Sequence, residues 1–408
     1  MSVAAAGVAT PIDRLPVART VLLGALVFGL LASISVTQIA LGALAAWVVL
    51  ARRAALIPPL RAPLLGPIVA FAAWTVVAAL ASARPLESLV SAKGLLNLGA
   101  MFVLANVLSE PQLARRFATW LLAGLGVVAL VGLVQVAACP GVDATGVLRK
   151  CTRARAFYSI YMTLGGVLML LLTSALPRLA CLGRDVAWLG PGWVLGAIAL
   201  ALTYVRGAWI GFAAGVLVAV AGLGRRGIAA ALVLVVLAGA LLLGLPAVRD
   251  RLRTIGTLAD PTTRDRVAML DAGRRLAQAH PLTGVGPGQV KHVYPSVATQ
   301  EALRRSTSHL HNTPMQIVVE RGVIGLAAWL WIFVAFFVRG TAVLRALPAA
   351  AAADRALVLG SLAACVAFLV GGLFEYNFGD TEVLLMAVTL MGLPFTLAGR
   401  PAPTAARS

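Results

Sequence analysis

The chain has 408 residues, of which 60% are apolar and only 12% are charged, and its mean hydropathy is +0.93. This composition excludes a water-soluble globular protein and predicts an all-α integral membrane protein, because lipid satisfies no backbone hydrogen bonds and only helices fit such runs. The net charge of +19 does not predict nucleic-acid binding, because much of the excess falls in short loops beside apolar runs, where Lys and Arg set topology. We therefore expect membrane lipid as a partner and no nucleic acid.

Apolar runs recur along the whole chain, each of about twenty residues and long enough to cross about 30 Å of hydrocarbon. They predict about twelve transmembrane helices in a single polytopic membrane domain over residues 1–408, with both termini on one side. The predicted spans are 18–36, 38–51, 64–82, 89–109, 116–138, 157–177, 187–204, 207–223, 227–246, 313–338, 356–373 and 381–399.

The basic residues of the short loops predict the orientation. With the N-terminus inside, pairs such as Arg52–Arg53 and Arg225–Arg226 fall on the cytoplasmic side, whereas the outward loops 82–88 and 374–380 are nearly free of Lys and Arg.

Two outward segments break this rule. Residues 139–155 carry Arg149, Lys150, Arg153 and Arg155, and residues 246–312 carry ten basic against five acidic side chains. The second segment contains the outward loop 247–312 that we predict between helices nine and ten. Translocating so much charge has a cost, so we expect these segments to have a use. For Cys139 and Cys151, both in the first segment, a disulfide and two free thiols are equally consistent with the sequence.

The outward loop 247–312 contains an amphipathic pattern and every histidine of the chain. Thr263 to Ala279 predicts a helix lying on or over the membrane surface, with Val267, Leu270 and Ala277 on one face. The T-G-V-G-P-G turn at 283–288 ends it. The four histidines are His280, His292, His309 and His311.

The stretch His309-Leu310-His311-Asn312 admits three interpretations. A metal site would need a third ligand at a defined spacing and none stands nearby, so we predict no metal. Helix capping explains Asn312, which is followed by Pro314 in the first turn. Capping does not explain why the histidines gather here, so we favour a general base at the mouth of a cavity.

Arg206 stands between two apolar runs in T-Y-V-R-G-A-W-I-G. An arginine at this depth usually faces a cavity or a partner anion, and the alternative is that it snorkels to the outer headgroups. Lys93, near the outer end of the fourth span, suggests the same role.

Basic residues of three outward segments can converge if the helices pack as one bundle. Guanidinium groups suit phosphate, because each planar fork pairs two oxygens, and at this depth a lipid-linked diphosphate is the natural ligand. The carboxylates nearest to a D-x-D metal motif are Asp380 and Glu382, which we interpret as a helix N-terminal cap. The converging residues are Arg149, Lys150, Arg153 and Arg155, then Arg206, then Arg264, Arg266, Arg274 and Arg275.

Three local motifs resemble the O-antigen ligase and polymerase superfamily of bacterial envelope enzymes. The first is H-x-H-N, then L/M-Q, then E-x-G-x-x-G-L; the second is an arginine fifteen residues before P-L-T-G-V-G-P-G; the third is an outward arginine followed by an aromatic residue and a glycine. The matching positions are His309, His311, Asn312, Met315, Gln316, Glu320, Gly322, Gly325 and Leu326, then Arg266 with 281–288, then 206–211.

This resemblance implies a lipid-sugar-dependent (GT-C type) glycosyltransferase fold with a large periplasmic loop, in the inner membrane. It also implies transfer of a glycan from undecaprenyl diphosphate without metal, nucleotide or other cofactor. His311 would be the base, and Arg206 and Arg266 would hold the diphosphate. The expected substrate-binding residues are His309, Lys93, Arg153, Arg155, Arg264 and Asn312.

Within the superfamily, about twelve spans and one dominant late outward loop favour a ligase that joins O-antigen to the lipid A-core. A polymerase of repeat units and a protein O-oligosaccharyltransferase stay open as alternatives. A transporter of lipid-linked sugar would also need an arginine-lined cavity, but not a histidine pair. The sequence shows neither the half-chain repeats nor the broken helices typical of transporters.

Overall fold

The structure is a computed structural model that describes residues 15–141, 150–181, 186–244, 249, 261–299 and 302–397. Helices make up all the regular structure in these ranges. The first half contains α1 (Leu15–Ala32), α2 (Ile34–Arg53), α3 (Leu65–Leu80), α4 (Pro85–Ser91), the 3-10 helix η1 (Ala92–Leu98), α5 (Gly99–Val107), α6 (Pro111–Ala137), the 3-10 turn η2 (Lys150–Thr152) and α7 (Tyr161–Leu179). The second half contains α8 (Val186–Leu202), α9 (Arg206–Ala221), α10 (Arg225–Leu243), α12 (Pro261–Ala279), α13 (Val290–Val297), α14 (Thr313–Ala346), α15 (Ala352–Gly371) and α16 (Thr381–Leu397).

Every predicted span coincides with an apolar helix or with a series of helices. In the described chain, 7 of these are long and apolar enough to cross a membrane, the one at 85–107 being made of α4, η1 and α5 together. The apolar helices α3, α8, α9, α10 and α16 are shorter. The protein is therefore an all-α integral membrane protein, and the number of twelve spans stays a prediction.

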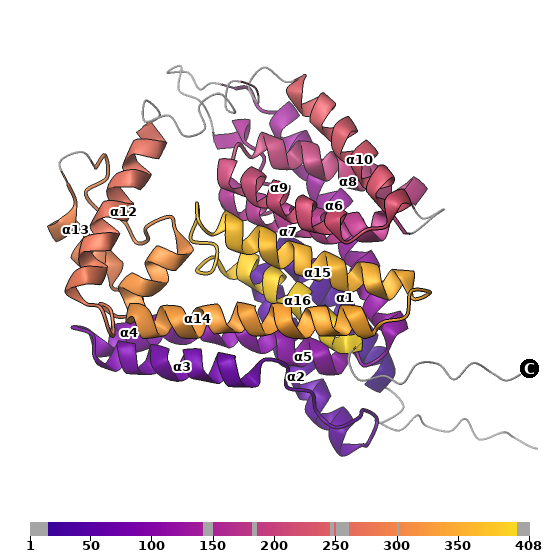
Figure 1. Cartoon of the computed structure of the whole chain (residues 1–408), viewed down its shortest axis with the longest axis horizontal. Coiled ribbons are helices and arrows are strands. Elements are labelled where there is room, and N and C mark those ends of the chain that lie inside the picture. Colours follow the sequence, from indigo (N-terminus) through magenta and orange to yellow (C-terminus); the bar gives the residue numbers. More distant parts are fainter. Residues whose placement is uncertain are drawn as a thin grey trace, which may run out of the picture.

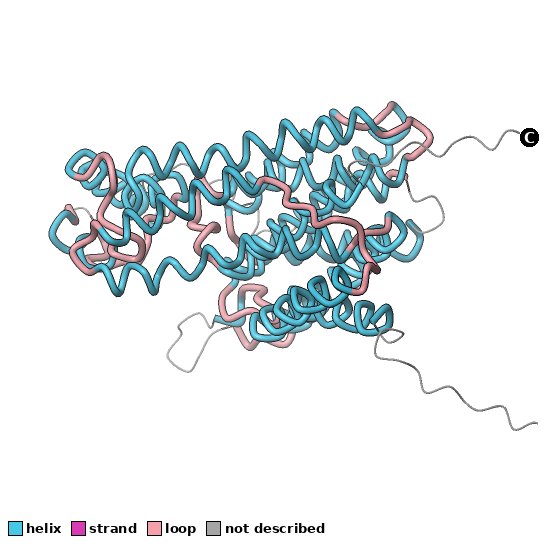
Figure 2. Tube along the Cα trace, turned by 90° about the horizontal axis from the view of Figure 1, so that it is seen from below, coloured by secondary structure: helices cyan, strands magenta, loops and turns pink. Residues whose placement is uncertain are grey.

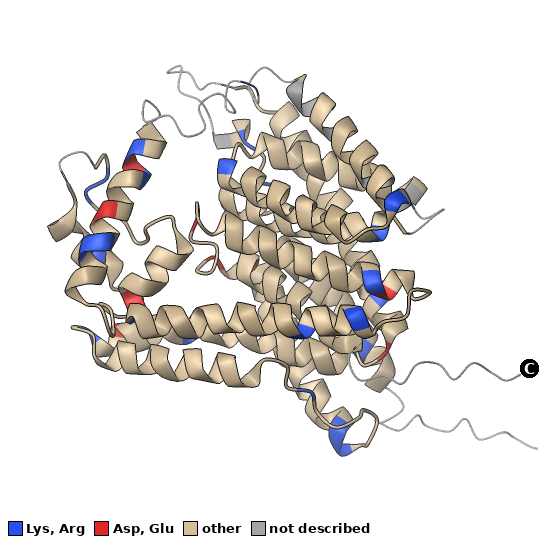
Figure 3. Ribbon diagram, in the orientation of Figure 1, with Lys and Arg blue, Asp and Glu red and all other residues tan. Residues whose placement is uncertain are grey.

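The helices run broadly side by side along the long axis of the molecule (Figures 1 and 2). Charged residues gather toward the two ends of the bundle and leave an apolar band between them (Figure 3). Helices α7, α15 and α16 are buried along most of their length at its centre. Helix α14 lies outside them and exposes Trp331, Val334 and Val338, as expected for side chains that face lipid.

Helices α12 and α13 lie at one end of the bundle, beside the first turns of α14 (Figure 1). They share a small hydrophobic core, separate from the main one, in which Met269 and Leu276 of α12 meet Tyr294 of α13 and Val319 of α14. The described part of the predicted loop 247–312 is thus a folded cap on the helical bundle. Arg149 and residues 251–260 lie outside the described residues.

Helix α14 is broken at Gly322, whose φ of 66° and ψ of −174° are not helical. A β-carbon there would lie 1.8 Å from the carbonyl oxygen of Leu282, so only glycine fits. The backbone groups that the break frees are paired with the Pro281–Gly288 turn. Val285 N–H donates to the Val319 carbonyl at 2.8 Å and Val323 N–H to the Pro281 carbonyl at 2.8 Å.

The second interruption is η1, which lies inside the predicted fourth span between α4 and α5. The expectation that no span is broken is therefore wrong, both here and at Gly322. Hydropathy does not reveal these interruptions, because both lie within stretches that are apolar on average.

Candidate functional site

A polar cavity of about 120 Å³ lies where the bundle meets the cap. Four arginines and two carboxylates line it, so the cavity favours an anion. The arginines come from three segments that are distant in sequence. Arg153, Arg206 and Arg266 belong to the predicted converging set, and Arg304 does not. The lining residues are Arg153, Tyr161, Met162, Tyr204, Val205, Arg206, Thr262, Asp265, Arg266, Arg304, His311 and Glu375.

His311 lies against this cavity with 8% of its surface exposed. Its φ is 49°, in the left-handed region that few residues other than glycine adopt and that is found at functional sites. The Nδ1 atom lies 2.9 Å from Oε2 of Glu375. If the proton on Nδ1 is donated to this carboxylate, Nε2 is left as the proton-accepting nitrogen, an arrangement that can serve general-base chemistry.

Glu375 is the site residue that the sequence analysis missed. One carboxylate oxygen pairs with His311 and the other accepts a hydrogen bond from Arg266. The Glu375 carbonyl in turn accepts from Thr313 Oγ1 at 2.9 Å. The only indication in the sequence was an acidic residue in an outward loop without a basic partner, 64 residues from His311.

Arg206 is the first residue of α9 and is buried, with 9% of its surface exposed. Its Nη2 lies 3.4 Å from Oγ1 of Thr263 on α12, and its side chain lines the polar cavity. Its burial and its place in the cavity lining favour the cavity-facing interpretation over snorkelling to the outer headgroups. The guanidinium and the positive end of the α9 helix dipole both attract an anion to this part of the cavity.

Arg153 stacks on Tyr161, with its Cζ 4.4 Å from the ring centroid. Arg153 comes two residues after Cys151, which forms a disulfide with Cys139. Of the two states that the sequence allowed for these cysteines, the structure has the disulfide. The disulfide ties η2 back to the end of α6, two residues before the arginine that reaches the cavity.

An apolar groove of about 200 Å³ adjoins the polar cavity and shares Arg206, Arg266 and His311 with it. Its walls come from α9, α12 and the loop after α15. Val267 is 49% exposed and Leu373 is 47% exposed, so the groove is open along one side. The other lining residues are Gly207, Ile210, Thr263, Leu270, Leu310 and Phe374.

The predicted helix at 263–279 exists as α12, and its position on or over the membrane surface stays a prediction. Within the cap, α12 packs against α13 and α14 through Met269, Ala272 and Leu276. Val267 and Leu270 line the apolar groove instead. The apolar pattern did not determine which face of the helix packs on the protein, because α12 has two apolar faces with different neighbours.

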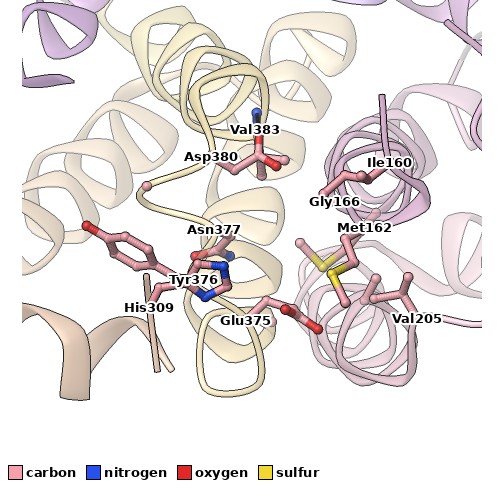
Figure 4. A pocket seen from close by; sticks show the side chains of 14 residues that line it. Ile160, Met162, Gly166, Val205, His309, Glu375, Tyr376, Asn377, Asp380 and Val383 are labelled. Atoms are coloured by element: carbon pink, nitrogen blue, oxygen red, sulfur yellow. Dashed lines mark hydrogen bonds between the residues drawn. The ribbon is translucent and has the colours of Figure 1, made fainter. Parts of the chain in front are cut away.

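His309 lines two further cavities, of about 200 Å³ and about 310 Å³. The two histidine rings are 4.3 Å apart, centroid to centroid. The smaller cavity is lined by His309, Glu375 and Tyr376, and the Glu375 side chain points toward Met162 and Val205 (Figure 4). Burial, followed by the repulsion from His311, lowers the pKa of His309 to about 4, so His309 is neutral at physiological pH.

Gln316 and Glu320, which belong to the motif that begins at His309, have a structural role. Gln316 Oε1 accepts from Leu310 N–H at 2.9 Å, and its amide donates to Glu320 Oε1 at 2.8 Å. Glu320 also accepts from Gly288 N–H at 2.9 Å and from Arg321 at 2.6 Å. This network joins the histidine stretch, the glycine-rich turn and α14, so the motif fixes where His309 and His311 lie.

The remaining predicted site residues lie away from these cavities. Asn312 caps α14 by accepting from Met315 N–H at 2.8 Å, and its amide donates to the Leu373 carbonyl, so its capping role is confirmed and its side chain is already engaged. Asp380 likewise accepts from Val383 N–H at the start of α16. Arg155, Arg264 and Lys93 are absent from the residues that line the four cavities. Substrate binding by Asn312, Arg155, Arg264 and Lys93 stays a prediction.

Residues 191–330 match a family model described as O-antigen ligase. Over this segment, the chain is similar to the O-antigen ligase family. The matched segment is about a third of the chain and contains Arg206, Arg266, His309 and His311, while Glu375 lies outside it. Among curated proteins, none matches this chain.

Proposed function

We propose that this protein is an O-antigen ligase, which transfers the O-antigen glycan from undecaprenyl diphosphate to the lipid A-core at the periplasmic face of the inner membrane. One observation carries the proposal: a cavity lined by four arginines adjoins both an apolar groove and the His311–Glu375 pair.

The donor is expected to bind across the polar cavity and the apolar groove. The diphosphate would lie among Arg153, Arg206 and Arg266, because guanidinium forks bind phosphate oxygens in pairs. The first isoprenoid units would lie along Val267 and Leu270 of the groove. A ligand that is charged at one end and apolar at the other fits the two adjoining sites together, whereas a soluble sugar nucleotide would leave the groove empty.

In the transfer step, a hydroxyl oxygen of the acceptor attacks the anomeric carbon of the donor. The bond from this carbon to the diphosphate oxygen breaks, and its electron pair leaves with the diphosphate. The hydroxyl proton passes to Nε2 of His311, and Glu375 stabilises the imidazolium. Arg206 stabilises the charge that grows on the departing oxygen, a contribution of about 2.7–4 kcal/mol for one donor in comparable sites.

A transporter of lipid-linked sugar is the alternative of another class. Its exclusion cannot rest on unbroken helices, because α14 and the 85–107 segment are both interrupted. The arrangement that favours an enzyme is the carboxylate-bound imidazole beside the arginine cavity. Transport alone requires no proton acceptor there.

The experiment that tests the function is the lipopolysaccharide pattern of a strain that lacks this gene. We expect loss of all long O-chains from the core, with undecaprenyl-linked polymer still accumulating. A single repeat unit attached to the core would instead indicate a polymerase. An unchanged lipopolysaccharide with loss of a protein-linked glycan would indicate a protein O-oligosaccharyltransferase.

The periplasmic orientation of the cap has a separate test. A cysteine at exposed Ser296 of α13 should react with a membrane-impermeant thiol reagent in cells with a permeabilised outer membrane. A cysteine at Ala350, between α14 and α15, should not react. The native exposed Cys181 is replaced by serine in both variants, and labelling at 350 alone would reverse the orientation.

A further inference from the structure

The cavities that the two histidines line differ in chemistry. Four arginines line the one beside His311. The largest cavity beside His309 has two charged lining residues, Glu320 and Arg321, and these pair with each other at 2.6 Å. The side chains that line this larger cavity therefore carry no net charge that would attract an anion.

What this cavity offers instead is neutral hydrogen-bonding groups. Asn97 of η1, Ser308 and Thr381 line it, and none of the three side chains has a hydrogen-bond partner within the part of the chain that the structure describes. Amide and hydroxyl groups without partners in a cavity of about 310 Å³ suit the hydroxyl groups of a sugar.

The cavity leads toward the base. His309, Tyr376 and Gly379 line both it and the smaller cavity, which also contains Glu375, the partner of His311. The rings of His309 and His311 are 4.3 Å apart. A hydroxyl group held beside the His309 ring is thus close to His311, the proposed base.

The interruption of the fourth span by η1 forms one wall of this cavity. Ser91, Ala92, Gly94, Leu95 and Asn97 all contribute to the wall. A continuous α-helix would present side chains at different angles, so the 3-10 segment brings Asn97 and Gly94 to the same opening.

We propose that the cavity between η1, the Pro287–Gly288 turn and the start of α16 holds the acceptor sugar, whose hydroxyl reaches His311 past His309 and Tyr376. The inference rests on the proposed transferase function. It places the donor beside His311 and the acceptor beside His309, with cations on the donor side and neutral polar groups on the acceptor side.

The test uses the purified full-length protein with undecaprenyl-diphosphate-linked O-antigen as donor and lipid A-core as acceptor. Asn97→Leu removes the amide at similar volume and should raise KM for the acceptor about threefold to tenfold, the range for one lost hydrogen bond. Gly94→Phe adds a ring where a β-carbon meets no atom within 4 Å, so it should fill the cavity and block the acceptor. Both variants should leave KM for the donor unchanged.

The matched control is Leu96→Ala, in the same 3-10 segment, because Leu96 is 81% exposed and does not line the cavity. It should leave both KM values unchanged. A raised donor KM in Gly94→Phe would assign the cavity to the donor glycan, and unchanged kinetics in both cavity variants would leave the cavity without a role; either result overturns the inference. Failure of the native enzyme to transfer at all would refute the proposed function instead.

Discussion

Arginines at the two ends of the bundle make different contacts, although both groups lie beside apolar helices. At the end opposite the cap, they complete the helices. Arg61 donates to the Phe395 and Thr396 carbonyls at 2.9 and 3.1 Å, and Arg355 to the Leu344 and Leu347 carbonyls at 2.9 Å. These carbonyls end helices and have no partner inside them.

At the cap end, Arg153, Arg206, Arg266 and Arg304 line one cavity. Two carboxylates offset part of their charge, so the cavity keeps an excess of positive charge for a ligand. The comparison teaches that an arginine near a membrane surface is assigned by what its N–H groups meet. An arginine that meets helix carbonyls is structural, and one that meets a cavity is available to a substrate.

The largest effect that sharpens this comparison is expected at the base, which only the cap end has. His311→Ala should reduce transfer by roughly 10²–10⁴-fold, because the acceptor hydroxyl loses its proton acceptor. Donor binding should be retained, because the arginines are intact. Transfer rates and binding of labelled donor to the purified protein measure the two effects. His309→Ala should be milder, and equal losses in the two variants would leave the base unassigned.

The next largest effect is expected from the buried arginine at the start of α9. Arg206→Ala should reduce transfer by about 10²–10³-fold, because the departing diphosphate loses a charge-stabilising donor. Arg206→Lys keeps the charge but loses the planar fork, so its activity should also fall substantially. The matched control is Arg355→Ala at the opposite end, which should lower thermal stability and leave transfer per folded molecule unchanged. Equal transfer rates in Arg206→Ala and Arg355→Ala would contradict the assignment of a substrate role to the arginines at the cap end alone.

A smaller loss is expected at Glu375. Glu375→Gln keeps a hydrogen-bond acceptor for His311 but removes the charge that stabilises the imidazolium, so transfer should fall roughly tenfold to a hundredfold. Transfer is measured per folded molecule, so that a mere loss of folding is not counted as a loss of activity.

The smallest effect concerns the pH dependence of His309. Its pKa is lowered from 6.5 to about 4, so it is neutral in the folded protein well above that pH. Protonation of His309 therefore cannot produce an acid limb between about pH 5 and pH 8. His309→Gln should leave the position of that limb unchanged even where it lowers the rate. A shift of the limb in this variant would contradict the neutral state.

The sequence by itself determined the helices, because runs of apolar residues in lipid have no alternative to the helix. It also determined the N-terminal capping of α14 by Asn312, since this contact spans only three residues, and its local motifs predict His311, Arg206 and Arg266 as site residues. Boundaries shifted by a few residues where polar residues continue a helix, as at the end of α14, which reaches Ala346.

Only the tertiary structure decided which side chains meet. Glu375 bonds to residues 64 and 109 positions away, and no local pattern encodes such a pairing. Arg153 lines the same cavity as Arg206 and stacks on Tyr161, although the two arginines are 53 residues apart in the sequence. The face on which α12 packs was equally undetermined. A helix with two apolar faces is oriented by the surfaces that it meets, and here those surfaces are α14 on one side and the open groove on the other.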